Sequence, residues 1–151
     1  MSVTVAGTVE SLRTDTSDPM TWSHNSGTTS PQGVIVMFLH GTSTTDHVST
    51  VTYGTKSLTR VVRHTDTAGE PGAAEIWFAG RDIPTGTQTV TADLASGTTD
   101  DILGISVTLD ADTDLYVVHS GTTATDANQA NPSFDLVTNK SSSMAFAAFY
   151  S

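Results

Sequence analysis

The sequence predicts an all-β protein, an antiparallel β-sandwich of jelly-roll-like architecture with about ten strands. Short runs that alternate apolar and polar residues recur along the chain, and clusters rich in Gly, Pro, Asp and Ser separate them. No stretch repeats apolar residues at helical spacing, so connecting helices are not expected. All five prolines stand in or beside the turn clusters, where a missing N–H removes no bond between strands.

The first run, Val3–Val9, alternates valine with smaller residues. It fits an edge strand of the chain's own sheet, or an N-terminal arm (residues 1–9) that adds as a strand to a neighbouring molecule. Both interpretations remain open. The start of the chain lacks a basic segment followed by an apolar one, so we expect no secretory signal. If the run is an arm, its contact residues with a neighbour are Ser2, Val3, Thr4, Val5 and Val9.

The second run, Val34–His40, is apolar on both faces. Ile35 and Met37 share one face of this strand, and Val36 and Phe38 share the other. A strand with two apolar faces is typical of the centre of a sheet that is covered on both sides. We therefore expect this strand in the middle of its sheet.

A hairpin is expected in the next part of the chain. Val48–Tyr53 and Ser57–His64 both alternate in the manner of half-buried strands, and Gly54-Thr55 joins them. Glycine at the first of two central turn positions favours a type II′ turn, whose twist matches that of the flanking strands.

The run Ala74–Ala79 combines a carboxylate with bulky apolar residues. Strand alternation puts Glu75 and Trp77 on one face and Ile76 and Phe78 on the other. Because charged side chains are rarely buried, we expect Glu75 to face solvent beside the indole.

The second half of the chain continues the same pattern. We find no internal repeat and no linker, so residues 1–151 are expected to form a single domain. Thr is β-branched and abundant, which favours solvent-facing strand positions. The remaining expected strands are Thr87–Ala95, Leu103–Leu109, Leu115–His119, Phe134–Thr138 and Met144–Tyr150.

Composition excludes several classes of partner. The net charge of −10, with six Lys and Arg scattered among carboxylates, argues against binding to nucleic acid. The longest apolar run, Val34 to Leu39, is far too short to span a bilayer, so no membrane partner is expected. The absence of cysteine removes disulfides and thiolate metal sites and is consistent with folding in a reducing cytoplasm.

Catalytic patterns are weak in this chain. The strand ending in His40-Gly41 is similar to the oxyanion-hole entry of α/β-hydrolases, but the G-x-S-x-G turn of those enzymes is missing. We therefore expect no enzyme activity and no cofactor. The histidines lack zinc-site spacing and are expected at strand ends or on the surface. They are His24, His40, His47, His64 and His119.

Two further sets of residues could bind ligands. Asp110, Asp112 and Asp114 have the alternate spacing of the first half of a calcium loop, but Leu115 follows where an EF-hand loop needs glycine. They bind calcium locally or are solvated turn carboxylates, and this choice stays open. Trp22 and Trp77 could stack on sugar rings, although aromatic residues usually serve the core.

Four segments, taken in order, resemble a β-sandwich family that is common in tailed bacteriophages, including phages of actinobacteria. The segments are TWSHNSGTTSPQGVIVMFLHGT, VSTVTYGTKSLTRV, DTAGEPGAAEIWFAG and IPTGTQTVTADL. Members of this family are described as head-decoration or minor tail proteins. The resemblance spans roughly residues 18 to 109, continues weakly into NPSFDLVT, and carries over no catalytic residue.

The resemblance implies a virion structural protein. We expect a non-enzymatic capsid decoration protein that binds the outer surface of the major capsid shell, stabilises it, and forms a homo-oligomer on the particle. It would fold in the host cytoplasm before assembly. A minor tail or fibre protein is the second expectation, and a carbohydrate-binding β-sandwich module that uses Trp22 and Trp77 is the third. A tail adhesin normally embeds such a domain in a longer chain, which favours the head.

Overall fold

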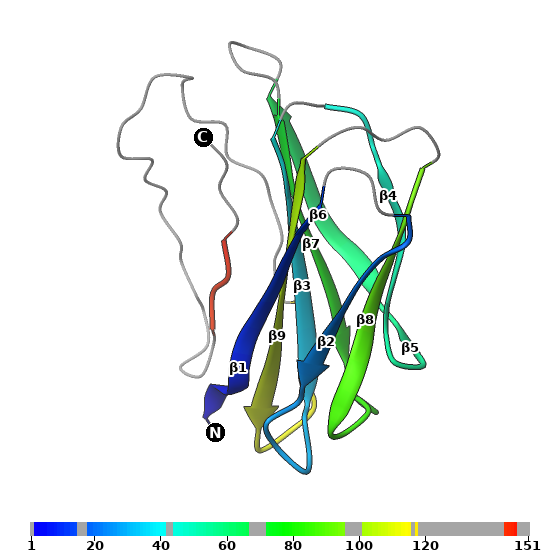
Figure 1. Ribbon diagram of the computed structural model, residues 1–151. Coiled ribbons are helices and arrows are strands. Elements are labelled where there is room, and N and C mark those ends of the chain that lie inside the picture. Colours follow the sequence, from blue (N-terminus) through cyan, green and yellow to red (C-terminus); the bar gives the residue numbers. More distant parts are fainter. Residues whose placement is uncertain are drawn as a thin grey trace.

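A computed structural model gives the structure of residues 2–14, 18–41, 44–66, 72–95, 101–115, 117 and 144–147 (Figure 1). All regular structure in these ranges is β-strand, and none of them contains a helix long and apolar enough to cross a membrane. The strands are β1 (Val3–Thr14), β2 (Met20–Asn25), β3 (Gly33–His40), β4 (Val48–Tyr53), β5 (Lys56–Ser57), β6 (Thr59–Asp66), β7 (Gly72–Gly80), β8 (Thr87–Leu94) and β9 (Ile102–Ala111).

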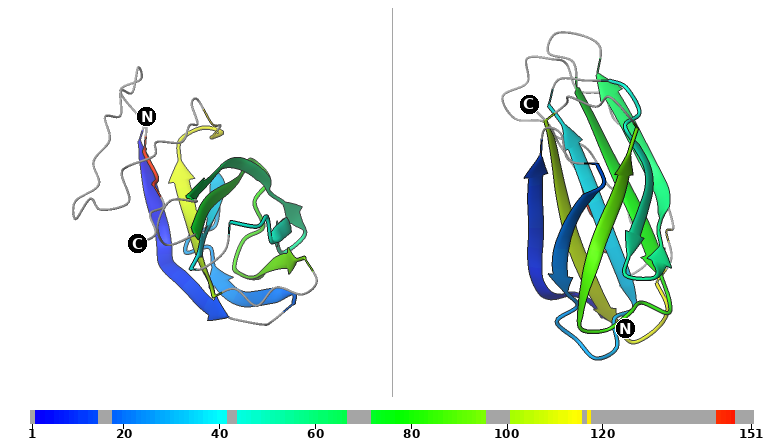
Figure 2. Two further views of the ribbon diagram at one scale, coloured as in Figure 1. Left: turned by 90° about the horizontal axis from the view of Figure 1, so that it is seen from above. Right: turned by 45° about the vertical axis from the view of Figure 1, so that its right-hand side comes forward.

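The strands form two open sheets that face each other (Figure 2). Sheet A has five strands in the order β1-β9-β3-β7-β6, and sheet B has four strands in the order β2-β8-β4-β5. All neighbouring strands are antiparallel. This arrangement confirms the predicted antiparallel β-sandwich.

The strand order also confirms the jelly-roll character. The chain behaves as one long hairpin folded over itself, in which β1 pairs with β9, β2 with β8, β3 with β7 and β4 with β5. The tip of this hairpin is the predicted turn. Gly54 has a φ of 56°, and Thr55 is not among the residues with positive φ, as a type II′ turn requires.

The main core lies between the two sheets. β3 contributes Val34, Val36 and Phe38, and β2 contributes Met20 and Trp22. The Trp22 and Phe38 rings meet edge to face, with centroids 6.2 Å apart. The other members of this core are Val48, Val51, Tyr53, Leu58, Trp77, Ala79, Ile83, Val90, Ala92, Leu94 and Ile102.

A second apolar cluster covers the outer face of sheet A. Its buried members are Ile35, Val107 and Leu109, and Leu115 and Phe146 pack against them. β3 therefore lies at the centre of its sheet with apolar residues on both faces, which confirms the expectation for Val34–His40. The partly buried apolar residues that pack against these buried members are Val3, Met37, Ile76, Phe78, Ile105, Leu115 and Phe146.

Some strand boundaries differ from those expected. β2 was missing from the expected strands, although Met20, Trp22 and His24 alternate inward along it. Residues 115, 117 and 144–147 form no strand, so the expectation of strands there was wrong in the part that the structure describes. Leu115 and Phe146 of these segments instead pack against the outer face of sheet A. Residues 134–138 lie outside the described ranges.

The close contact between Gly104 and the Trp22 ring generates a stability prediction. A methyl group at Gly104 would lie 2.7 Å from Trp22 Cη2 and 2.9 Å from Met20 Cε. We expect Gly104→Ala to lower the free energy of unfolding by about 1–3 kcal/mol, because the filled core cannot accept the methyl group without shifting.

Urea unfolding measures this change. Gly41→Ala is the matched control, because its added methyl group would meet Asp101 only at ordinary contact distances. Equal stability of the two variants would contradict the packing described for Trp22.

Candidate functional site

The predicted N-terminal contact segment forms part of the protein's own sandwich. β1 is the outermost strand of sheet A, where Val3 lies opposite Ala111 and Val5 opposite Leu109 of β9 (Figure 2). The Ser2 amide donates a hydrogen bond to the Asp112 carboxylate at 3.2 Å. The structure thus places this segment as an edge strand. The side chain of Val9 lies outside the described part of β1.

The two tryptophans considered for glycan contact lie inside the molecule. Trp22 comes from sheet B and Trp77 from sheet A, and both rings are buried in the core between the sheets. Trp22 Nε1 donates to Ser106 Oγ at 2.8 Å, and Trp77 Nε1 donates to a Glu75 oxygen at 2.9 Å. Neither ring presents a face on which a sugar could stack.

A polar chain centred on His24 links the two sheets. His24 Nδ1 lies 2.8 Å from Ser106 Oγ, and His24 Nε2 lies 3.0 Å from Thr108 Oγ1. The Thr108 hydroxyl can donate to the carbonyl oxygens of Ala6 and Ser26, at 3.1 and 3.0 Å. This donation requires His24 to carry its proton on Nε2 and to accept from Ser106 through Nδ1. The buried imidazole therefore cross-links β2 to β9.

Glu75 is the centre of a second buried network. We expected this side chain to face solvent, and that expectation was wrong, because Glu75 is fully buried in the core beside Trp77. Its Oε1 lies 2.9 Å from His40 Nε2, and its Oε2 accepts from Trp77 Nε1 at 2.9 Å and from Arg60 Nη1 at 3.5 Å. Three donors around one carboxylate compensate for the lost contact with water.

Arg60 connects this network to the surface. Its guanidinium lies over the Trp77 ring, 5.4 Å from the centroid, and it donates to Asp46 at 2.6 Å. Partial burial alone would raise the pKa of Asp46, but the Arg60 hydrogen bond and the charges of Arg60, Arg63 and His40 outweigh that effect and lower it. This ion pair ties the connection between β3 and β4 to the edge strand β6.

Arg63 holds the same connection from a second point. Its Nη2 donates to the carbonyl oxygens of Thr44 and Thr45, at 2.7 and 2.8 Å. His47 stacks on His40 with ring centroids 6.0 Å apart. Of the histidines expected at strand ends or on the surface, His40 does end β3, but both it and His24 are buried.

The three aspartates with calcium-like spacing have different partners. Asp110 accepts from Thr28 Oγ1 at 3.5 Å, Asp112 accepts from the Ser2 amide, and Asp114 forms an ion pair with Arg81. No group of three or more His, Asp or Glu residues in the described ranges is arranged to hold a metal ion. The structure does not bring these carboxylates together into one site.

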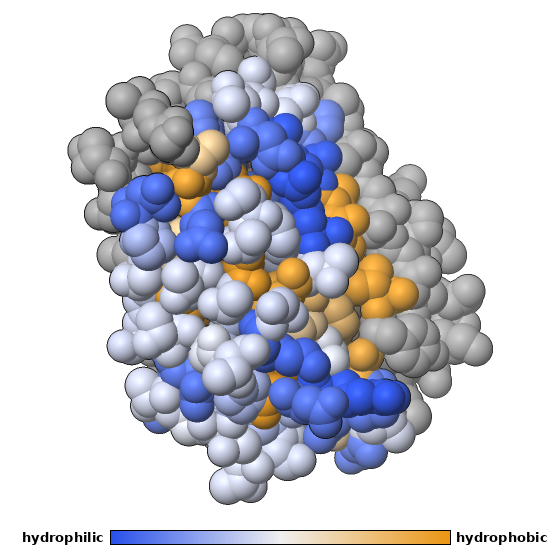
Figure 3. Space-filling model, turned by 90° about the vertical axis from the view of Figure 1, so that its right-hand side faces the viewer, coloured by the Kyte–Doolittle hydropathy of each residue, from blue (hydrophilic) through white to orange (hydrophobic). Residues whose placement is uncertain are grey.

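The outer faces of the two sheets differ in chemistry. Across sheet B, Thr21 lies opposite Thr91, Thr91 opposite Thr52, and Thr52 opposite Ser57, which makes a row of hydroxyl groups over all four strands. The view from the side of β4, β5 and β8 accordingly shows mainly hydrophilic and neutral colours over these strands (Figure 3). Sheet B therefore presents a polar face to solvent.

The outer face of sheet A is apolar. Val107, Ile35 and Phe78 form one row across its three central strands, and Ile105, Met37 and Ile76 form the next. The three exposed large apolar side chains of the described residues belong to segments of this face. They are Val5 at 46% exposure, Val117 at 44% and Met144 at 37%.

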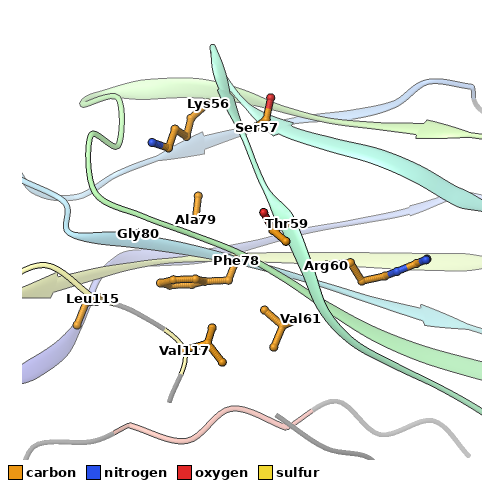
Figure 4. Close-up of a pocket in the computed structure, with 10 residues that line it drawn as sticks. All are labelled: Lys56, Ser57, Thr59, Arg60, Val61, Phe78, Ala79, Gly80, Leu115 and Val117. Atoms are coloured by element: carbon orange, nitrogen blue, oxygen red, sulfur yellow. The ribbon is translucent and has the colours of Figure 1, made fainter. Parts of the chain in front are cut away.

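A shallow groove of about 480 Å³ crosses this face beside β6. Phe78, Val61, Leu115 and Val117 gather along it, and Lys56 and Arg60 lie on either side (Figure 4). Arg60 is already engaged with Asp46 and Glu75, so the groove offers mainly apolar contact.

No family model, no curated protein and no solved structure matches this chain. The resemblance to phage accessory proteins therefore remains an expectation, and the function is inferred from the two outer faces of the sandwich.

Few local patterns in the sequence indicate the two polar networks. Glu75, His40 and Arg60 come from three different strands, and their convergence depends on the register between β3, β7 and β6. The one available signal was the inward alternation of Met20, Trp22 and His24, which resembles a strand only if histidine is counted as a buried residue.

Burial of Tyr53 generates a pH prediction. Its hydroxyl has no hydrogen-bond partner among the described residues, and burial raises its pKa to about 12. The unfolded chain has a tyrosine pKa of about 10, so the stabilising effect is complete below pH 10 and is lost as the pH rises toward 12. We expect thermal unfolding scans to show a steep fall of Tm in this range, and Tyr53→Phe to weaken that fall. An unchanged alkaline profile in the variant would contradict it.

Removal of the buried charge tests the second network. We expect Glu75→Gln to lower the free energy of unfolding by about 3 kcal/mol, because the amide cannot accept from three donors at once. Chemical denaturation measures the loss. Asp82→Asn removes the same charge at an exposed position and should change stability by less than about 0.5 kcal/mol. Similar effects of both substitutions would show that the network contributes nothing specific.

Proposed function

We propose that this protein is a non-enzymatic decoration protein of a tailed bacteriophage head, which binds the outer surface of the major capsid shell and stabilises it. The observation that carries this proposal is the difference between the two outer faces. An apolar cluster packs on the outer face of sheet A, where Val5, Val117 and Met144 are exposed, and sheet B presents hydroxyl groups. A thin sandwich of this kind suits a protein that lies with one face on another protein and the other face in water.

The interior of the sandwich supports a structural role. The side chains that would suit acid–base chemistry, His24, His40 and Glu75, are buried and bonded to partners inside the core. In these positions they fix the pairing of strands and are closed to a substrate. Binding through a surface is therefore favoured over catalysis at a cleft.

The charge of the chain is also consistent with this role. A net charge of −10 makes copies repel one another, so close packing of copies on a shell needs specific contacts. The apolar face of sheet A supplies contact area without adding carboxylates. Many weak contacts, repeated over a symmetric shell, would give the required strength.

Copy number on purified particles tests the placement. A head decoration protein should be present as a fixed fraction of the major capsid subunits, and quantitative mass spectrometry of particles measures that ratio. A copy number that matches the few tail subunits would instead indicate the minor tail role.

A binding experiment tests the proposed face. We expect Val117→Lys to weaken binding to shells that lack the protein by about tenfold, because a charge would be buried at the contact. Thr89→Lys adds the same charge on the exposed face of sheet B and should bind like the wild type. Loss of binding only with Thr89→Lys would reverse the proposed orientation.

A further inference from the structure

β1 forms one edge of sheet A, and one side of this strand has no partner strand within the described residues. β1 is the last strand of sheet A and pairs, within the described residues, only with β9. Ser2, Thr4 and Val5 are exposed along it. In the part of the chain that the structure describes, no strand lies against the backbone groups of β1 that do not face β9, so they could pair with a further strand.

Residues 2–6 carry none of the devices that normally protect an edge, and the register of β1 shifts only after Ala6. They include no charged residue and no proline. At the opposite edge of sheet A, β6 carries Arg60 and Arg63 and shifts register between Arg60 and Val62. Charges and register shifts of this kind block the addition of strands. One edge of sheet A is therefore protected, whereas the stretch 2–6 of the other edge is not.

Apolar side chains accompany the unprotected backbone. Val5 is 46% exposed and lies opposite Leu109, a buried member of the outer cluster. Val3 is partly buried and packs against the same cluster. A strand added beside β1 would bury Val5 and extend the apolar rows, so backbone and side chains would both gain partners.

We propose that the added strand is β1 of a second copy of this chain, paired antiparallel about a two-fold axis. An identical antiparallel segment is self-complementary about a two-fold axis, since residue i of one copy meets residue j of the other and residue j meets residue i. The uncharged edge also lets two chains of net charge −10 meet without opposing carboxylates. The two five-stranded sheets would become one continuous sheet with its apolar face on one side.

The length of the pairing is limited by Gly7. Gly7 has a φ of 69°, and the register with β9 shifts between Ala6 and Glu10. The 26–30 loop abuts this point so closely that a Cβ at Gly27 would lie 2.1 Å from Gly7 Cα. The flat part of the edge therefore covers residues 2–6, and the dimer is weak and dependent on concentration. This inference concerns the isolated protein and does not depend on binding to a capsid.

Sedimentation velocity over a range of protein concentrations tests the proposal. We expect a monomer–dimer equilibrium in the wild type, and a dissociation constant at least about tenfold higher for Val5→Lys. Thr89→Lys is the control, since it adds the same charge at an exposed position on sheet B and should leave the constant unchanged. Circular dichroism and Tm check that both variants are folded. A wild type that stays monomeric, or equal constants in both variants, overturns the proposal.

Cysteine cross-linking gives a second measurement that does not depend on a disruptive substitution. The chain contains no cysteine, so each single variant reports on one position. Residues next to a two-fold axis approach within the distance that a disulfide needs. We expect at least one of Val3→Cys, Thr4→Cys and Val5→Cys to form a covalent dimer on mild oxidation, much faster than Thr89→Cys on sheet B. Equal rates at all four positions overturn the two-fold pairing.

Discussion

The structure depends on one constraint: each strand before the turn at Gly54 pairs with a strand after it. The turn at Gly54 folds the chain back, and from there the pairs β4–β5, β3–β7, β2–β8 and β1–β9 follow in order. Each half alone leaves its strands without most of their neighbours. The core, both polar networks and the two unlike faces exist only when the two halves are wound together. Such non-local pairing favours cooperative and comparatively slow folding.

The buried polar networks reinforce this winding. His24 bonds β2 of sheet B to Ser106 and Thr108 of β9 in sheet A, and so fixes how the sheets lie over each other. Glu75 joins β7 to β3 through His40 and to β6 through Arg60. An apolar core tolerates small slips, whereas a buried carboxylate or imidazole is satisfied in only one register. The polar groups thus add specificity to a core that apolar packing stabilises.

The sequence predicted the fold more completely than the sites, for physical reasons. Val34–His40 was placed correctly because apolar residues on both faces are a local signal, and Gly54 marked its turn because the required φ is a local property. Glu75 was misplaced because the side chains that donate hydrogen bonds to it, His40 and Arg60, stand 35 and 15 positions away in the sequence. Strand alternation gave it the right neighbour, Trp77, but could not say which face was inside. A resemblance to phage proteins adds an expectation of function that local patterns do not contain.

The pairing of β1 with β9 has a mechanical consequence. Val3 lies opposite Ala111, so the beginning of one strand and the end of the other stand side by side at the same edge of the sandwich. Tension that separates these two points would break the hydrogen bonds between β1 and β9 one after another and would meet low resistance. Tension along the strands would load the ladder all at once and meet high resistance. The molecule is therefore soft when its N-terminal strand is peeled away and stiff along its length, so its behaviour under load depends on the direction of pulling.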